Sequence, residues 1–162
     1  HEGEISIGKY SLITPGVRIM AAKKIVIGDA CMIAHGAYIS DADWHGIYDR
    51  AEPVGKTKPV VLEDNVWIGD SAIICKGVTI GKNSIIGAGA VVTKDVPENS
   101  VFAGNPAKQV KKLDKEKFNT RENFFEDPKK LAHDFDMLDK YTLKDNSILN
   151  WIKSLINPDK SH

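Results

Sequence analysis

An aliphatic residue returns at every sixth position through the middle of this 162-residue chain. The step runs unbroken through Leu62, Ile68, Ile74, Ile80, Ile86 and Val92. This period matches neither an α-helix, which repeats every 3.6 residues, nor a plain β-strand, which repeats every two. It is typical of a triangular coil whose three short faces each point one aliphatic residue inward, so that stacked coils bury the aliphatic columns. The pattern therefore predicts a parallel β-helix.

A β-sandwich or meander of short strands with glycine turns is the alternative interpretation. Glycines do lie between the aliphatic positions, for example Gly69, Gly81 and Gly87. Sandwich strands do not keep a fixed short period, however, and the step from Leu62 to Val92 is unbroken. The β-helix is therefore the favoured fold class.

The same step begins near the start of the chain. It runs through two further sets, Ile7, Ile13 and Ile19, and then Ile27, Ile33 and Ile39. Between the two sets the segment Ala21–Lys24 shifts the phase by two residues, which predicts a bulge at a corner. The expected coils are 5–24, 25–59, 60–77 and 78–95, followed by a partial coil.

The second expected coil is too long by the segment 41–58, DADWHGIYDRAEPVGKTK. This segment lacks the period and is rich in charged residues, aromatics, Gly and Pro. One such interruption of an ordered coil is typical of a scaffold that carries a functional loop. A tolerated surface insertion is the alternative, but the close grouping of Trp44, His45, Tyr48 and Arg50 favours a function.

The composition changes after Leu113, where the repeats have ended. Asp127 and Pro128 predict the N-cap and first turn of a helix. A second helix is expected over Asn146–Ile156. We therefore expect an all-β domain over 1–112, with its loop excursion at 41–58, and a helical extension over 113–162. The extension is expected to cap the coils or bridge subunits, with a separate binding module as the alternative.

Charge and composition narrow the classes of partner. Lys plus Arg and Asp plus Glu both number 22, so the formal net charge is zero and neither nucleic acid nor an anionic membrane surface is an expected partner. No apolar run approaches the roughly 20 residues of a membrane span, and no signal-peptide pattern is evident. Cys31 and Cys75 both lie within the repeats, which favours space-filling thiols in a reducing, cytoplasmic setting.

Four motifs together resemble those of the hexapeptide-repeat acyltransferases, most closely the maltose, galactoside and lipopolysaccharide O-acetyltransferase group. They are NVWIG (Asn65–Gly69), CKGVTIG (Cys75–Gly81), IGAGAVVTKDVP (Ile86–Pro97) and AGNPAK (Ala103–Lys108). The resemblance covers residues 5–112. It implies a left-handed parallel β-helix and a homotrimer. It also implies acetyl-CoA in the groove between two adjacent β-helices, and a saccharide or nucleotide-sugar acceptor at a subunit junction.

A sugar hydroxyl needs a general base as it attacks a thioester, and a neutral imidazole suits this role. In the family the base is a His in the loop that follows an inward aliphatic residue, which makes His45 the candidate here. Relatives place this His one position earlier, where this chain has Trp44, so a one-residue loop adjustment is expected. His35, at a coil corner, is expected to be a structural residue or to contact substrate in the groove, and it is the reserve candidate for the base.

The loop 41–58 carries the other candidates for the acceptor side of the site. Asp43 or Asp41 would orient the imidazole through its second nitrogen, loop solvation being the alternative. Tyr48, Asp49 and Arg50 would bind sugar hydroxyls, and Trp44 would stack on a sugar face.

The resemblance also assigns coenzyme A contacts. They are Trp67, Ala88, Thr93, Lys94, Lys108 and Lys111. Trp67 would border the pantetheine arm, with subunit packing as its alternative role, and the Ala88 backbone N–H would contact the pantetheine. Lys108 and Lys111 would lie near the adenosine phosphates, where relatives often carry arginine. Lysine there keeps the charge but loses bidentate geometry.

The leading hypothesis is therefore a CoA-dependent O-acetyltransferase. One alternative is N-acetylation of an amino sugar or nucleotide sugar with the same base and groove. A γ-class carbonic anhydrase would need three zinc-binding histidines, and only His35 and His45 lie in the coil region, so no metal is expected. A non-catalytic β-helix subunit is the alternative outside the enzymes.

Overall fold

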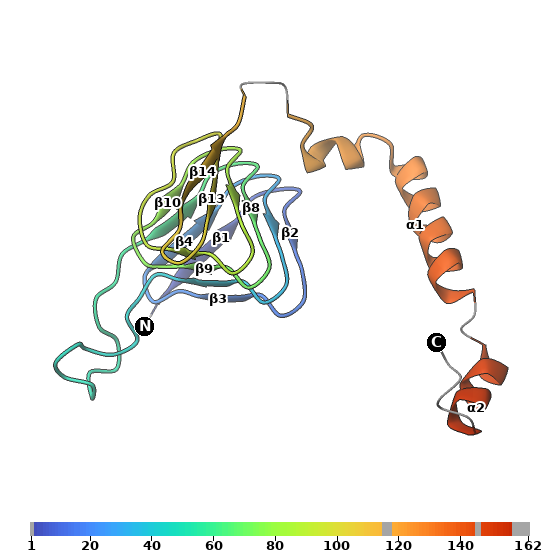
Figure 1. Ribbon diagram of the computed structural model, residues 1–162, viewed down its shortest axis with the longest axis horizontal. Coiled ribbons are helices and arrows are strands. Elements are labelled where there is room, and N and C mark those ends of the chain that lie inside the picture. Colours follow the sequence, from blue (N-terminus) through green and yellow to red (C-terminus); the bar gives the residue numbers. More distant parts are fainter. Residues whose placement is uncertain (1, 115–117, 145–146, 157–162) are drawn as a thin grey trace. The chain divides into compact units, whose positions relative to one another are not determined.

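Each six-residue step forms one short strand and one corner in the computed structural model, which describes residues 2–114, 118–144 and 147–156. Residues 1–122 form the first of two compact units. In this unit successive coils stack so that their strands pair in parallel (Figure 1). The predicted parallel β-helix is thus confirmed. The second unit is 123–162, and the domain boundary expected after residue 112 stays a prediction.

Three sheets make the three sides of the coils. The first contains β1 (Glu4–Ile7), β4 (Lys24–Ile27), β7 (Val60–Leu62) and β10 (Thr79–Ile80). The second contains β2 (Leu12–Ile13), β5 (Met32–Ile33), β8 (Trp67–Ile68), β11 (Ile85–Ile86), β13 (Ser100–Ala103) and β14 (Lys108–Lys112). The third contains β3 (Arg18–Met20), β6 (Tyr38–Ser40), β9 (Ile73–Ile74) and β12 (Val91–Val92). Only β14 pairs antiparallel among these strands, and it covers the edge of β13 at the end of the last coil.

The inward aliphatic residues form the core as expected. Their columns run in register through the sheets, as in Ile33, Ile68 and Ile86, each of which is fully buried. The first coil differs, because Ile7 and Ile13 are 50% and 37% exposed. They occupy the inward positions of the first coil, so only one neighbouring coil covers them.

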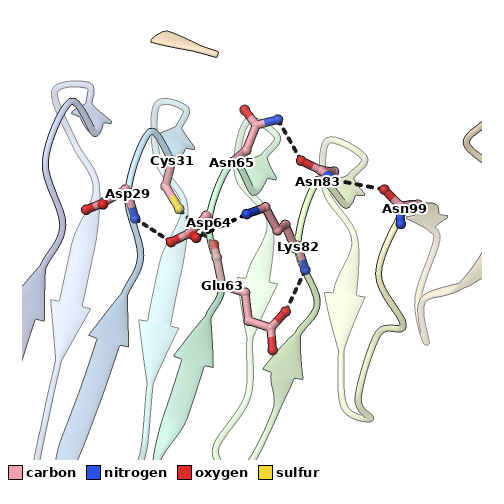
Figure 2. A network of polar contacts seen from close by, with 8 residues as sticks. All are labelled: Asp29, Cys31, Glu63, Asp64, Asn65, Lys82, Asn83 and Asn99. Carbon is pink, nitrogen blue, oxygen red and sulfur yellow. Dashed lines mark hydrogen bonds and ion pairs between the residues drawn. The ribbon is translucent and has the colours of Figure 1, made fainter. Parts of the chain in front are cut away.

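One corner of every coil requires a left-handed backbone conformation. Tyr10 and Ala30 take it in the first two coils, with φ of 59° and 56°. Asn65, Asn83 and Asn99 take it in the next three, with φ of 56°, 61° and 54°. Asparagine tolerates this conformation better than most residues. The side-chain amide of Asn65 donates to Asn83 (3.0 Å) and that of Asn83 donates to Asn99 (2.9 Å), which forms the ladder in Figure 2.

Carboxylates beside this ladder also bind from coil to coil. Asp64 accepts a hydrogen bond from the Asp29 N–H at 3.0 Å, and Glu63 accepts one from the Lys82 N–H at 2.8 Å (Figure 2). The Lys82 ammonium lies 3.4 Å from Asp64. The corners are therefore tied to one another by polar contacts, while the strands are tied by the backbone ladder.

The remaining elements are a short 3₁₀ helix (Arg121–Phe125), α1 (Pro128–Leu143) and α2 (Ile148–Ile156). The predicted N-cap is confirmed, because Asp127 accepts hydrogen bonds from the N–H groups of Lys129 and Lys130 at 3.1 and 3.0 Å. The second predicted helix is α2, which begins two residues later than expected; Asn146 lies outside the described residues. None of the described helices is long and apolar enough to cross a bilayer.

Replacement of the middle asparagine tests the ladder. Asn83→Ala removes two hydrogen bonds and places alanine in a left-handed conformation, so we expect the free energy of unfolding to fall by about 2–4 kcal/mol. Asn83→Gly loses the same bonds but tolerates the conformation, so it should lose roughly 1 kcal/mol less. Urea unfolding of both variants separates the contribution of the hydrogen bonds from that of the left-handed conformation. Equal stability of Asn83→Gly and the wild type would show that the ladder contributes nothing.

Candidate functional site

The segment 41–58 leaves the solenoid through a two-stranded neck, made by residues 41–43 and 55–58. Its arms are antiparallel, with a bridge between Ala42 and Thr57. Three backbone hydrogen bonds join them, from Asp43 N–H to Lys56 O (2.9 Å), from Gly55 N–H to Asp43 O (2.7 Å) and from Lys58 N–H to Asp41 O (2.8 Å). The neck therefore gives the irregular segment a defined exit and return.

Asp41 stands at the first position of the neck and is completely buried. Its carboxylate accepts hydrogen bonds from the N–H groups of Ala22, Lys23 and Lys24 at 2.7, 2.8 and 2.6 Å. These donors belong to the corner where the six-residue pattern shifts phase. A carboxylate is a strong acceptor for such backbone groups, so Asp41 is committed to the scaffold and Asp43 is the remaining candidate partner for His45.

Beyond the neck the chain folds around an open pocket of about 400 Å³. Its walls include four residues that the sequence nominated, His45, Asp43, Tyr48 and Asp49. Charged side chains from the same segment, Glu52 and Lys56, also line it. Trp44 and Arg50 do not line the pocket. The structure thus brings the predicted base together with part of the predicted acceptor site.

Trp44, which directly precedes His45, is tied to the solenoid. Its indole N–H lies 3.2 Å from the Tyr38 hydroxyl and 3.1 Å from Ser40 Oγ. The Arg18 guanidinium in turn lies 4.8 Å from the centre of the Tyr38 ring. This contact fixes the chain just before the candidate base, and stacking of Trp44 on a sugar stays a prediction.

The Asp43 carboxylate forms an ion pair with Lys76, whose Nζ lies 2.5 Å from Oδ1. Lys76 belongs to the corner before β10 and is 33 residues away in the sequence. Lys76 was not predicted to contact the site, because the sequence CKGVTIG indicates only a family motif there. Glu52 and Lys56 were not predicted either, since no local pattern indicates which residues of a loop face a pocket. Orientation of the His45 imidazole by Asp43 stays a prediction.

His35 lies apart from this pocket, on the corner between β5 and β6. Its Nδ1 is 2.7 Å from the Pro15 carbonyl oxygen. Because a carbonyl only accepts, this contact assigns the proton to Nδ1 and leaves Nε2 free in the neutral ring. A Cβ on Gly16 would lie 2.7 Å from His35 Cε1, so the glycine makes room for the ring. His35 is therefore held in one orientation although its side chain is exposed.

The candidate coenzyme A contacts are all exposed. Trp67 faces outward from β8, and Lys108 and Lys111 lie on β14. Ala88 occupies the corner between β11 and β12, and within the described residues its backbone N–H makes no hydrogen bond. A backbone N–H without a partner on an exposed residue is suited to a ligand carbonyl. The individual roles of these residues stay predictions.

The thiols are poorly suited to nucleophilic chemistry. Burial raises the pKa of Cys31 to about 11, and its S–H donates to the Glu63 carbonyl at 3.1 Å. Burial also raises the pKa of Cys75. A protonated thiol is a weak nucleophile. Among residues 2–114, 118–144 and 147–156, no group of three or more His, Cys, Asp or Glu side chains is placed to hold a metal ion.

Known proteins that resemble this chain in sequence contain the same hexapeptide repeats. Residues 59–94 match the family described as bacterial transferase hexapeptide (six repeats). The galactoside O-acetyltransferase of Escherichia coli is 36% identical over 111 residues, which are 67% of this chain and 54% of that protein.

Two solved structures have a similar fold. The maltose O-acetyltransferase from Clostridium difficile 630 has a TM-score of 0.64 and 41% identity, over 68% of this chain and 60% of that one. A hexapeptide-repeat acetyltransferase from Vibrio cholerae, in complex with acetyl coenzyme A, has a TM-score of 0.64 and 36% identity, over 68% and 61%. The chain therefore spans between 54% and 61% of the length of these three relatives.

The raised thiol pKa values predict selective protection from alkylation. At pH 8 a thiol with a pKa of about 11 is roughly 0.1% thiolate, so Cys31 of the folded protein should stay unlabelled by iodoacetamide. Cys75, which is only half-buried, should react sooner. Mass spectrometry of digested protein, with a urea-unfolded sample in which both thiols react, measures the difference. Equal labelling of Cys31 in the folded and unfolded protein would contradict its burial.

Proposed function

The chain is a hexapeptide-repeat protein related to acetyltransferases, as its sequence predicted, and from this premise we propose that it transfers an acetyl group from acetyl-CoA to a hydroxyl of a saccharide or related acceptor. The observation that carries the proposal is the pocket of the 41–58 excursion. It places His45 beside polar side chains on a scaffold shared with enzymes of this activity.

His45 is the proposed general base. Its imidazole takes the proton of the acceptor hydroxyl as the hydroxyl oxygen attacks the thioester carbonyl. The tetrahedral oxyanion then collapses, the carbon–sulfur bond breaks, and the imidazolium returns the proton to the departing thiolate. Asp43, which lines the same pocket, is the proposed partner that orients the imidazole. Backbone N–H groups would stabilise the oxyanion.

The exposed coil corners form the proposed coenzyme A groove. Ala88 would donate its unused N–H to the pantetheine, and Trp67 would cover the pantetheine arm. Thr93 and Lys94, both exposed after β12, would continue the groove. The ammonium groups of Lys108 and Lys111 would neutralise the adenosine phosphates as point charges.

The excursion is the proposed acceptor site. Tyr48 is fully exposed and Arg50 is exposed, so both are free to bind sugar hydroxyls. Trp44 would offer its ring to a sugar face while its indole N–H remains on the scaffold. His35, with its free Nε2, would contact substrate from the neighbouring corner.

A homotrimer is proposed as the active form. An apolar row faces outward on the second sheet, where neighbouring positions in register are Leu12, Met32, Trp67, Ile85 and Val101. The corresponding row on the first sheet is mixed, with Ser6, Val26, Val61 and Thr79. An exposed apolar stripe of this kind suits contact with another copy of the chain. The free thiols Cys31 and Cys75 fit the cytoplasmic setting that we propose.

Removal of the base tests the reaction. Thiol release from acetyl-CoA is measured against a panel of sugars, amino sugars and nucleotide sugars for the wild type, His45→Ala and His35→Ala. We expect acceptor-dependent release that falls by about 10²-fold or more in His45→Ala, as for loss of a general base. His35→Ala should retain most of kcat, with an effect confined to KM for the acceptor.

The reverse pattern would assign the base to His35. Release that depends on amino groups rather than hydroxyls would identify an N-acetyltransferase. Binding of acetyl-CoA without release, for every acceptor in the panel, would favour a non-catalytic subunit.

Matched substitutions test the trimer. Met32→Glu places a charge in the apolar row of the second sheet, and Val26→Glu places the same charge in the mixed row of the same coil. Both positions are half-buried and face outward. By sedimentation velocity we expect a trimer for the wild type and Val26→Glu, and dissociation for Met32→Glu. A monomeric wild type would contradict the shared groove.

A further inference from the structure

The neck of the excursion rests on a corner of the next coil. This corner contains Lys76 and Gly77, immediately before Val78 returns to the core. The Gly77 N–H donates to the Lys58 carbonyl at 3.1 Å, which ties the returning arm of the neck to the corner. A Cβ on Gly77 would lie 2.8 Å from Lys58 Cδ, so the missing side chain lets the Lys58 stem lie against the backbone.

The same corner also ties the outgoing arm. Lys76 reaches Asp43, and their side chains are only 27% and 33% exposed. A second coil-to-coil ion pair, Lys82 with Asp64 beside the asparagine ladder, is 53% and 51% exposed and longer, at 3.4 Å. Solvent screens an exposed pair strongly and a half-buried pair less. The Lys76–Asp43 contact is therefore the better suited of the two to hold a segment in place.

His45 lies two residues beyond Asp43 and one residue beyond Trp44. Trp44 is held on the third sheet through Tyr38 and Ser40. The two residues before His45 are thus held by their side chains, Trp44 through its indole N–H and Asp43 through its ion pair with Lys76. These two attachments hold the backbone immediately before His45 against the coils.

We infer that Lys76 is a positioning residue for the candidate base. By holding the Asp43 carboxylate, it sets the direction in which the neck leaves the solenoid and so places His45 relative to the groove. This role rests on the proposed function, because it matters for chemistry only if His45 reacts. Lys76 itself lies outside the lining of the pocket and needs no contact with substrate.

The test compares Lys76→Met, Lys76→Arg, Asp43→Asn and the double variant Lys76→Met/Asp43→Asn in the full chain. Hydrogen exchange of the neck amides Asp43, Gly55 and Lys58 reports the neck without any substrate. Lys76→Met should speed this exchange about tenfold and lower kcat roughly 10- to 100-fold, as for a displaced catalytic group. The KM for acetyl-CoA should change less than about twofold, because the groove residues are untouched.

Two features of the result separate positioning from general stability. Lys76→Arg keeps the cation and should recover most of kcat and of the amide protection. The double variant should be no worse than Asp43→Asn alone, since Lys76 acts through the Asp43 carboxylate that this variant already removes. The matched control is Lys82→Met, which removes the Lys82–Asp64 pair away from the neck and should leave the exchange of the neck amides and kcat unchanged.

The predictions for hydrogen exchange and for kcat can be contradicted independently. Unchanged neck exchange in Lys76→Met, or additive losses in the double variant, would overturn the role of Lys76 whatever the activity. A loosened neck with an unchanged kcat would also overturn it, because the neck would then not position the base. A wild type that releases no thiol would count against the proposed function, while the exchange would still decide whether Lys76 holds the neck.

Discussion

Stacking of the coils in register is the constraint on which the structure of this solenoid depends. Parallel backbone hydrogen bonds set one spacing between coils, close to 4.8 Å, and inward aliphatic residues such as Ile33, Ile68 and Ile86 fill that spacing without gaps. Residues inserted within a strand would put the aliphatic residues that follow them out of register with both neighbouring coils. Any additional residues must therefore leave and return at a corner, and the excursion at 41–58 does so.

The corners of the coils must meet two requirements that this regular stacking imposes. Each coil needs a left-handed residue at the same corner, and its unpaired backbone N–H groups need acceptors. Asparagines meet the first need in the later coils, where their amides also bind one another (Figure 2). Carboxylates meet the second, and Asp41 does this at the irregular corner before β4 with three backbone hydrogen bonds. Polar residues at corners thus keep the apolar columns aligned.

The candidate site combines residues of the regular coils with residues of the irregular excursion at 41–58. The proposed coenzyme A contacts occur at positions that the coils repeat, such as the corner of Ala88 and the outward face of Trp67. The proposed base lies on the excursion, which shares no repeat with them. Its placement therefore depends on contacts that join the excursion to the coils, namely the neck, the Trp44 indole and the Lys76–Asp43 pair. In the proposed arrangement, acceptor specificity can change with the loop while the proposed coenzyme A groove stays the same.

The sequence by itself determined the β-helix, the segment that interrupts it and the N-cap of α1 at Asp127. These features follow from patterns that are local or that repeat, and each repeat adds evidence for the same geometry. Only the tertiary structure decided that Asp41 serves the scaffold, that Asp43 meets Lys76 and that His35 is oriented by Pro15. Those contacts join residues 17 to 33 positions apart. Which residues meet across coils depends on the length and path of every intervening corner and loop, and no local pattern encodes that path.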